Sequence, residues 1–373
     1  MPAPRSFRFA MLVGLTLAGP SFAAEPQEER PASPFLTGDF RWTVGEPVLA
    51  INQDRLPAVA GHRWVSVKDP SVVRHDGRWH LFCTLRNIKE GKGNGQVRIG
   101  YLSFETWADA PSADWALLDL TTGYHGAPQV LYFAPQKKWY LIYQALDESR
   151  DLLYGPCYSV ADRVDDPTAW TKPEPLYIVP EETRKLGEMK AGIDFWLICD
   201  DEKAYLFYTT LDGRMRRAET ALANFPDQGW SQPVVALKAD VFEASHTYRL
   251  KGDGRYLTMI EAQKNRRRYF KAYVADRLDG PWIGLADSLQ RPLVSTANVV
   301  NQPESWATSY SHGEFIRDGV DQRLIVDPSA TRILFQGVDD AGYRVGNYRQ
   351  IPWRLGLLEP APARSTERLG ADD

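Results

Sequence analysis

The sequence predicts an all-β fold, a five-bladed β-propeller, and three observations support this prediction. Five pairs of apolar, aromatic-rich segments follow one another along the chain, and a short turn separates the members of most pairs. The 373 residues include 12 Trp, 17 Tyr, 15 Phe, 28 Gly and 26 Pro, a composition typical of many short strands joined by tight turns. No long stretch places apolar residues at helical spacing, which argues against a helical repeat protein.

The amino terminus is predicted to carry a secretory signal peptide in residues 1–23. A basic start precedes an apolar run at residues 9–18, and the small residues that follow fit cleavage after Ala23. This run is shorter than the roughly 20 residues that a spanning helix needs, and no later run is longer, so no membrane span is expected. Residues 24–39 are predicted to form a flexible Pro-rich leader, and the protein is expected to be secreted or periplasmic.

The repeated units begin after this leader, and each supplies a first strand and a second strand. The first strands are expected at residues 67–73, 127–133, 193–198, 242–248 and 311–316. The second strands are expected at residues 77–82, 138–143, 204–208, 254–260 and 331–335. Units of roughly 50 to 75 residues with about four short strands each are typical of propeller blades, although hairpins can also recur by chance in a large all-β protein. Because a propeller closes only with all its blades, residues 40–358 are predicted to form one domain, followed by a polar tail at residues 359–373.

The first strand of each blade lines the central channel of a propeller, so polar residues near its start should converge there at equivalent positions. In the five units these residues are Asp69, Gln129, Asp194, Glu243 and Glu314. Four carboxylates in one confined place are costly unless they are paired or used, since desolvation and like-charge repulsion both oppose ionisation. One carboxyl group then keeps its proton while another stays charged, as a general acid and a general base require. Taken singly, each of these residues could also have a purely structural role.

Glycoside hydrolysis is the chemistry that most often uses two carboxylates without a cofactor motif. The sequence contains no Gly-rich phosphate loop, no zinc-binding Cys or His pattern and no Gly-x-Ser-x-Gly nucleophile motif. The formal net charge of −4 leaves no basic stripe for a nucleic acid partner. We therefore expect a monomer whose partner is a polysaccharide or an oligosaccharide.

Several segments along the chain carry a resemblance to a known family. They are residues 68–73, 77–80, 127–144, 194–200, 242–244, 268–270, 311–314 and 351–358. In this order they resemble the α-L-arabinofuranosidases of glycoside hydrolase family 62 over nearly the whole predicted domain. The resemblance implies a five-bladed propeller and an inverting enzyme that hydrolyses arabinofuranosyl side chains from arabinoxylan or arabinoxylo-oligosaccharides.

The same resemblance implies a role for each of three carboxyl groups. Asp69 matches the general base that activates water, and Glu243 matches the general acid that protonates the leaving oxygen. Asp194 matches a third carboxylate that tunes the pKa of the acid and orients it. An inverting pair of carboxyl groups needs room between them for a water molecule.

Further positions match the family's binding residues. Lys68, Arg268 and Tyr348 match positions that line the arabinose pocket, and Gln129 is expected to bind substrate with them, close to the channel bottom. A calcium ion at the propeller axis is also implied, with His312 as its matching ligand.

Three loops depart from the family pattern, at residues 85–96, 146–157 and 209–212. They are expected to surround the pocket, so they leave the catalytic assignment in place and affect which glycan main chain is bound. The nearer alternative is a related propeller glycosidase that acts on another pentose-containing polymer such as arabinan. The alternative from another class is a non-catalytic carbohydrate-binding propeller, which would have no reason to keep Asp69, Asp194 and Glu243 together.

Overall fold

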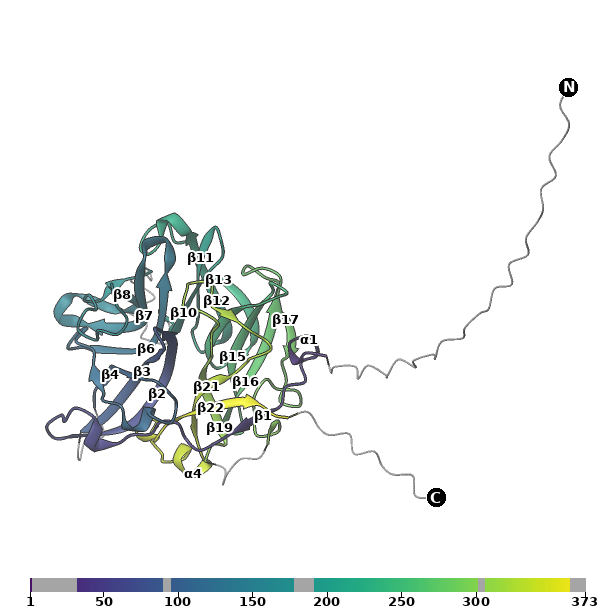
Figure 1. Cartoon of the computed structure of the whole chain (residues 1–373). Coiled ribbons are helices and arrows are strands. Elements are labelled where there is room, and N and C mark those ends of the chain that lie inside the picture. Colours follow the sequence, from purple (N-terminus) through teal and green to yellow (C-terminus); the bar gives the residue numbers. More distant parts are fainter. Residues whose placement is uncertain (2–31, 90–94, 178–190, 301–305, 363–373) are drawn as a thin grey trace, which may run out of the picture. The chain divides into compact units, whose positions relative to one another are not determined.

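The computed structural model describes residue 1 and residues 32–89, 95–177, 191–300 and 306–362 (Figure 1). The expected signal peptide, most of the expected leader and most of the expected tail lie outside these residues. No helix in the described part of the chain is long and apolar enough to cross a membrane.

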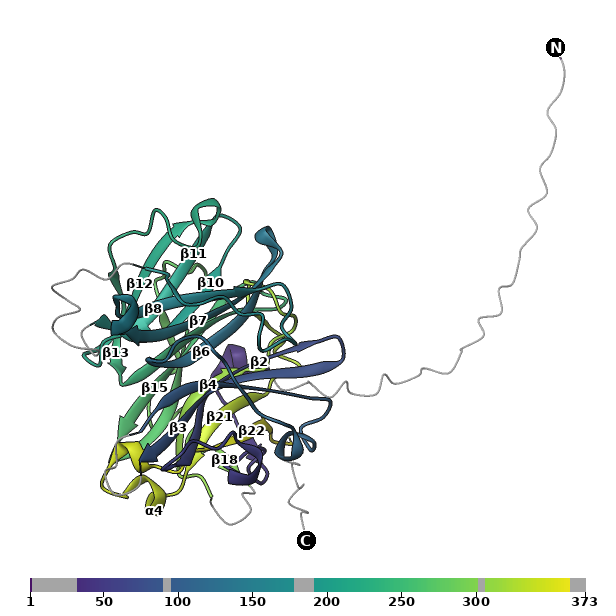
Figure 2. The ribbon, with the colours of Figure 1, turned by 90° about the vertical axis from the view of Figure 1, so that its left-hand side faces the viewer.

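Five mainly antiparallel sheets, which we call blades 1 to 5, form the domain, and the predicted five-bladed propeller is confirmed. Blade 1 contains β2 (His62–His75), β3 (Arg78–Lys89), β4 (Val97–Phe104) and β5 (Ala116–Leu117), and blade 2 contains β6 (Tyr124–Phe133), β7 (Lys138–Asp147), β8 (Leu152–Ala161) and β9 (Glu174–Pro175). Blade 3 contains β10 (Ile193–Cys199), β11 (Lys203–Thr209), β12 (Gly213–Ala221) and β13 (Val234–Val241). Blade 4 contains β14 (Glu243–Leu250), β15 (Tyr256–Lys264), β16 (Arg267–Ala275) and β17 (Ile283–Ala286), with β20 (Ile325–Val326) parallel to β14. Figure 2 shows the strands of blade 2 lying next to those of blade 1.

Blade 5 joins the two ends of the domain. It contains β19 (Ser309–Phe315), β21 (Ile333–Val338), β22 (Arg354–Pro360), β1 (Trp42–Val44) and β18 (Val299–Val300). The amino-terminal strand β1 pairs antiparallel with the carboxy-terminal strand β22, which closes the ring of blades. The indole Nε1 of Trp42 donates a hydrogen bond of 2.7 Å to the carbonyl of Leu293, so this strand is also fixed to the chain that precedes blade 5.

The end of the predicted flexible leader is part of the folded domain. Pro34–Thr37 form the short helix α1, and the hydroxyl of Ser33 accepts a hydrogen bond from the N–H of Phe35 at its start. The Phe35 ring is buried and packs edge to face against Phe40, with ring centroids 5.3 Å apart. The prediction of flexibility up to residue 39 is therefore wrong for residues 33–39, because one aromatic side chain anchors them to the core.

Each inner strand contains a β-bulge, and the five bulges fall at equivalent places. One extra residue separates the paired positions on either side of each bulge. The residues at the bulges have positive φ and are Asp69 (50°), Ala127 (51°), Asp194 (55°), Ala244 (41°) and His312 (35°). The predicted equivalence of five polar residues is thus correct only for blades 1 and 3. Glu243 precedes its bulge residue by one position, whereas Gln129 and Glu314 follow theirs by two.

The residues two positions after the bulges connect each blade to the next. Each of these side chains is buried and hydrogen-bonds the main chain of the neighbouring inner strand. The pairs are Ser71 with the N–H of Val130 (3.0 Å), Gln129 with the N–H and C=O of Leu197 (2.7 and 2.8 Å), Trp196 with the C=O of Thr247 (3.0 Å), His246 with the C=O of Gly313 (2.7 Å) and Glu314 with the N–H of Val72 (3.2 Å). These bonds run from blade 1 through blade 5 and back to blade 1, so we call them the closing ring.

One end of the channel is crossed by the chain between β19 and β21. The carbonyls of Val320 and Gln322 accept hydrogen bonds from β6 and β10, each 2.8 Å long. The carbonyl of Leu324 accepts one from β14, and Arg317 donates to main-chain carbonyls of β2 and β6. Because this segment binds the last residues of the inner strands, a ligand can enter the channel only near their first residues.

Candidate active site

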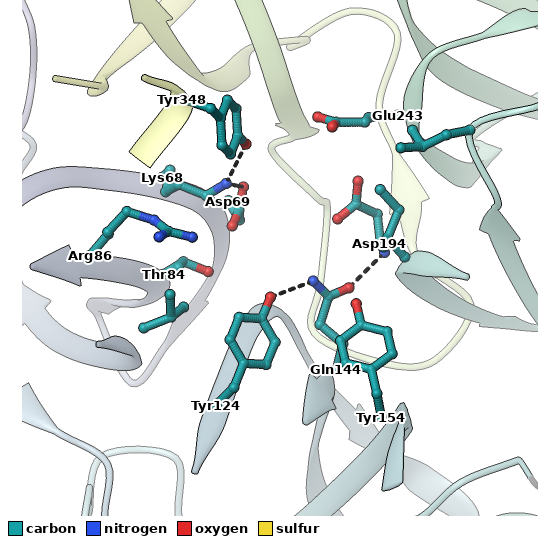
Figure 3. A pocket seen from close by; sticks show the side chains of 13 residues that line it. Lys68, Asp69, Thr84, Arg86, Tyr124, Gln144, Tyr154, Asp194, Glu243 and Tyr348 are labelled. Atoms are coloured by element: carbon teal, nitrogen blue, oxygen red, sulfur yellow. Dashed lines mark hydrogen bonds and ion pairs between the residues drawn. The ribbon is translucent and has the colours of Figure 1, made fainter. Parts of the chain in front are cut away.

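A pocket of about 150 Å³ lies at the open end of the channel, and Figure 3 shows its lining. Lys68 and Asp69 come from β2, Asp194 comes from β10 and Glu243 comes from β14. Tyr348 reaches the pocket from a short 3₁₀ helix, η6 (Tyr348–Gln350), between β21 and β22. The structure therefore brings together five of the residues that the sequence singled out, and two of them, Asp69 and Asp194, are bulge residues.

Asp69 lies beside a positively charged side chain. The Lys68 Nζ atom is 3.1 Å from the Asp69 Oδ1 atom and donates a second hydrogen bond, also 3.1 Å long, to the Tyr348 hydroxyl. Burial alone would lower the pKa of Lys68, but Asp69, Tyr348 and Glu243 together outweigh this effect and hold that pKa above its usual range. The N–H of Asp69 donates to the Gln336 Oε1 atom at 2.7 Å, which fixes the main chain at this bulge.

Asp194 is held as a carboxylate. Burial acts to raise its pKa, yet the nearby positive charges of His312 and Lys68 prevail and lower that pKa to about 2. The Asp194 Oδ1 atom is 3.7 Å from the His312 Nδ1 atom, and its Oδ2 atom accepts a hydrogen bond of 3.1 Å from the N–H of Ala244. This last contact joins Asp194 to the residue directly after Glu243.

Glu243 shows the opposite behaviour. Burial raises the pKa of Glu243 to about 7, and the negative charges of Glu261 and Asp194 add to this effect, while Arg268 opposes it. The Arg268 Nη1 atom lies 2.6 Å from the Glu243 Oε2 atom. At neutral pH this carboxyl group is thus divided between its acid and ionised forms, as a general acid requires.

Arg268, on β16, supports Glu243 from behind and does not line the pocket with it. Its guanidinium is buried, and Nη1 also contacts Glu261 at 2.8 Å and the Ser311 hydroxyl at 3.0 Å. The ring of Phe242 lies 4.8 Å from the guanidinium carbon. The structure places Arg268 against Glu243 and outside this pocket lining, where the sequence resemblance implied contact with sugar.

Gln129 also lies outside the pocket lining. It is fully buried, and both polar atoms of its amide bind the main chain of Leu197 in the closing ring. No polar atom of this side chain is left to bind a ligand directly. Its position supports a structural role.

His312 faces two carboxylates at the axis. Its Nδ1 atom is 3.5 Å from Asp69 Oδ1 and 3.7 Å from Asp194 Oδ1. Burial opposes its protonation, but these negative charges raise its pKa to about 9, so the ring is positively charged at neutral pH. In the described residues no three His, Cys, Asp or Glu side chains form a group that could hold a metal ion. Calcium prefers six to eight oxygen ligands, so an ion here would take most of them from water, and calcium at the axis stays a prediction.

Sequence reasoning missed four polar residues that support the site from second strands. Their side chains accept hydrogen bonds from the N–H groups of bulge residues, at distances of 2.7 to 2.9 Å. They are Thr84 on β3, Gln144 on β7, Glu261 on β15 and Gln336 on β21. The available signal was a single polar residue in an otherwise apolar strand, as in Leu-Ile-Tyr-Gln at residues 141–144. Arg86, Tyr124 and Tyr154 also line the pocket and had no comparable signal.

Comparisons with known proteins agree on one family. The family model described as Glycosyl hydrolase family 62 matches residues 54–359. Alpha-L-arabinofuranosidase C of Cellvibrio japonicus is 34% identical over 329 residues, which cover 87% of this chain. The chain spans about half of that relative, 47% of its length.

Solved structures give the same result. The catalytic domain of a Coprinopsis cinerea GH62 alpha-L-arabinofuranosidase is 36% identical, with a TM-score of 0.76 over 87% of this chain and 98% of that chain. A GH62 hydrolase in complex with xylotriose is 33% identical, with a TM-score of 0.75 over 87% of this chain and 98% of that chain. The resemblance carried by the sequence motifs is confirmed, and the chain belongs to glycosyl hydrolase family 62, a family of glycoside hydrolases.

Proposed function

We propose that this protein is an inverting α-L-arabinofuranosidase that removes arabinofuranosyl side chains from arabinoxylan or arabinoxylo-oligosaccharides. The observation that carries the proposal is a pair of carboxyl groups with widely separated pKa values in one small pocket. Glu243 has a pKa of about 7, whereas Asp194, which binds the residue after it, has a pKa of about 2. Such divergence identifies an acid that can donate a proton beside a group that stays charged.

Each carboxyl group has a distinct role in the proposed reaction. Glu243 donates its proton to the glycosidic oxygen as the bond to the sugar breaks. Asp69 accepts a proton from a water molecule that attacks the opposite face of the sugar, which inverts the anomeric configuration. Asp194 remains ionised, raises the pKa of Glu243 by its charge and stabilises positive charge that develops on the sugar ring.

The shape of the pocket supports removal of one terminal sugar. Its volume of about 150 Å³ is below the range of roughly 300 to 1,000 Å³ for sites that enclose drug-sized ligands. The far end of the channel is crossed by the chain, so a polysaccharide cannot pass through it. A polymer main chain would therefore lie across the open end, with a single side-chain sugar in the pocket.

One solved relative supports a xylan main chain as the polymer that is bound. The relative solved in complex with xylotriose is 33% identical to this chain, and the match covers 98% of that relative. The signal expected in residues 1–23 supports an enzyme that works in the periplasm or outside the cell.

The direct test measures arabinose released from wheat arabinoxylan, with branched and debranched arabinan assayed beside it. Release from arabinoxylan is expected to exceed release from either arabinan. The reverse order would move the substrate to arabinan, and no release by the folded protein would favour a non-catalytic binding role. NMR of the first-formed sugar should show the inverted anomer, and the retained anomer would contradict the role of Asp69.

Replacing Glu243 tests the acid. Glu243→Gln should lower kcat on arabinoxylan by about 10² to 10⁴-fold, because the leaving oxygen then receives no proton. The loss should be much smaller on an aryl arabinofuranoside, whose leaving group needs no proton. Equal losses on the two substrates would contradict this role.

A further inference from the structure

Arg86 is a positively charged residue of the pocket that the proposed reaction does not use. It lies on β3, two residues beyond Thr84, and both side chains line the pocket. Because side chains two residues apart in a strand share a face, Arg86 lies on the same face as Thr84 and closer to the end of β3. Figure 3 shows its guanidinium on the Lys68 side of the pocket, across from Asp194 and Glu243.

No described residue pairs with this guanidinium. The Arg86 Nε atom is buried and has no hydrogen-bond partner within the described part of the chain. In the same blade, Arg98 on β4 donates hydrogen bonds to three main-chain carbonyls. Arg268, which serves the same site from behind, binds two carboxylates. A buried N–H without a partner is costly, so the Nε atom of Arg86 points to a bound group.

The ion pairs around the pocket leave Arg86 as the unpaired cation among the described residues of the site. Lys68 is paired with Asp69, and Arg268 is paired with Glu243 and Glu261. Arg86 has no such partner, so it is the basic side chain of the pocket that is available to a negatively charged ligand.

We propose that Arg86 is a specificity determinant that binds the carboxylate of a uronic acid carried by the glycan main chain near the arabinosylated residue. A guanidinium presents a planar fork of donors that matches a carboxylate in a bidentate way. The position of Arg86 near the end of β3, where the main chain of the polymer would pass, suits a substituent on that chain. Arg86 also lies within residues 85–96, where the sequence departs from the family pattern. The inference rests on the proposed arabinofuranosidase function.

The test compares two forms of one substrate. An arabinoxylo-oligosaccharide that carries one glucuronic acid is assayed beside the same oligosaccharide after chemical reduction of its carboxyl group to an alcohol. The wild-type protein should show a higher kcat/KM on the acidic form, and added salt should reduce this preference. Arg86→Gln should lower the ratio of acidic to reduced kcat/KM by about tenfold, because it removes the charge-assisted hydrogen bonds. Arg86→Lys should keep part of the preference, since it keeps the charge without the fork.

The control is Arg74→Gln, which removes one positive charge from an exposed position at the other end of β2. For Arg74→Gln the ratio of kcat/KM on the acidic form to kcat/KM on the reduced form should equal that of the wild type. A wild-type protein with equal kcat/KM on the two forms would overturn the proposal, and so would an Arg86→Gln variant with an unchanged ratio. If neither form is hydrolysed, the proposed function fails, and calorimetric binding of the two forms to the wild type still decides the role of Arg86.

Discussion

Two carboxyl groups in this pocket differ in charge at neutral pH, and the difference arises from their neighbours. Asp194 faces the positively charged ring of His312, which together with Lys68 overcomes the cost of burial. Glu243 is half-buried beside the negative charges of Glu261 and Asp194, and one guanidinium does not offset burial and these charges. Two carboxyl groups in the same pocket thus acquire different protonation states.

The pH dependence of activity follows from Glu243. Its carboxyl group must be protonated to act as an acid, so kcat/KM on arabinoxylan should fall as the pH rises through about 7. The alkaline limb should be absent for an aryl arabinofuranoside with a good leaving group. A full pH profile of kcat/KM on both substrates checks this, and an alkaline limb shared by both would assign it to another group.

Asp194 should influence that limb through its charge. In Asp194→Asn the negative charge that helps raise the pKa of Glu243 is lost, so the alkaline limb should move to lower pH. The amide oxygen can still accept the hydrogen bond from Ala244, so the fold should remain. The measurement is the pH profile of kcat/KM for the variant beside that of the wild type. An alkaline limb at the same pH in both would show that the charge of Asp194 does not raise the pKa of Glu243.

At the scale of the strand, one repeated feature, the β-bulge, positions both pocket-lining and structural side chains. Each inner strand carries an extra residue at positive φ, which changes the direction of the side chains that follow. In blades 1 and 3 the residue at the bulge is an aspartate of the pocket. Two residues later, the side chain points away from the pocket and binds the next blade, as Gln129 does with Leu197.

The closing ring predicts a stability effect at Gln129. Gln129→Ala leaves a buried N–H and a buried C=O of Leu197 without partners, which should lower the free energy of unfolding by about 2 to 5 kcal/mol. Denaturant unfolding followed by tryptophan fluorescence measures this loss. Gln228→Ala, at an exposed position, serves as the control and should change the free energy by less than about 0.5 kcal/mol. Equal stability of the two variants would show that the closing ring contributes little.

At the scale of the molecule, the site depends on closure of the whole ring. Its pocket takes side chains from blades 1 to 4 and from η6, so no single blade contains it. Closure is made by β1, which comes from the start of the domain and completes blade 5 beside β22. Trp42 on this strand is 2% exposed and binds the carbonyl of Leu293, so it couples the closure to the core.

Removing the Trp42 side chain should therefore destabilise the whole domain. Trp42→Ala is expected to lower the free energy of unfolding by about 3 to 5 kcal/mol, and arabinose release should be lost at the same temperature as the fold. Trp42→Phe keeps most of the buried volume but loses the indole N–H and part of the ring, so its cost should be smaller, about 1 to 2 kcal/mol. Calorimetry of the three proteins checks both values. Loss of activity well below the unfolding temperature would show that blade 5 opens separately.

The sequence by itself determined the fold class, the family and the three catalytic candidates. Its five strand pairs repeat a local pattern of apolar and aromatic residues, and such patterns are visible because they depend on neighbours in the chain. The motifs around Asp69, Asp194 and Glu243 identified the family for the same reason. Only the tertiary structure decided which polar residues face the pocket, since a one-residue bulge reverses the face on which the following side chains lie. It moved Gln129 into the closing ring, placed Arg268 behind Glu243 and brought Arg86 into the pocket, because contacts between blades join residues that are far apart in the sequence.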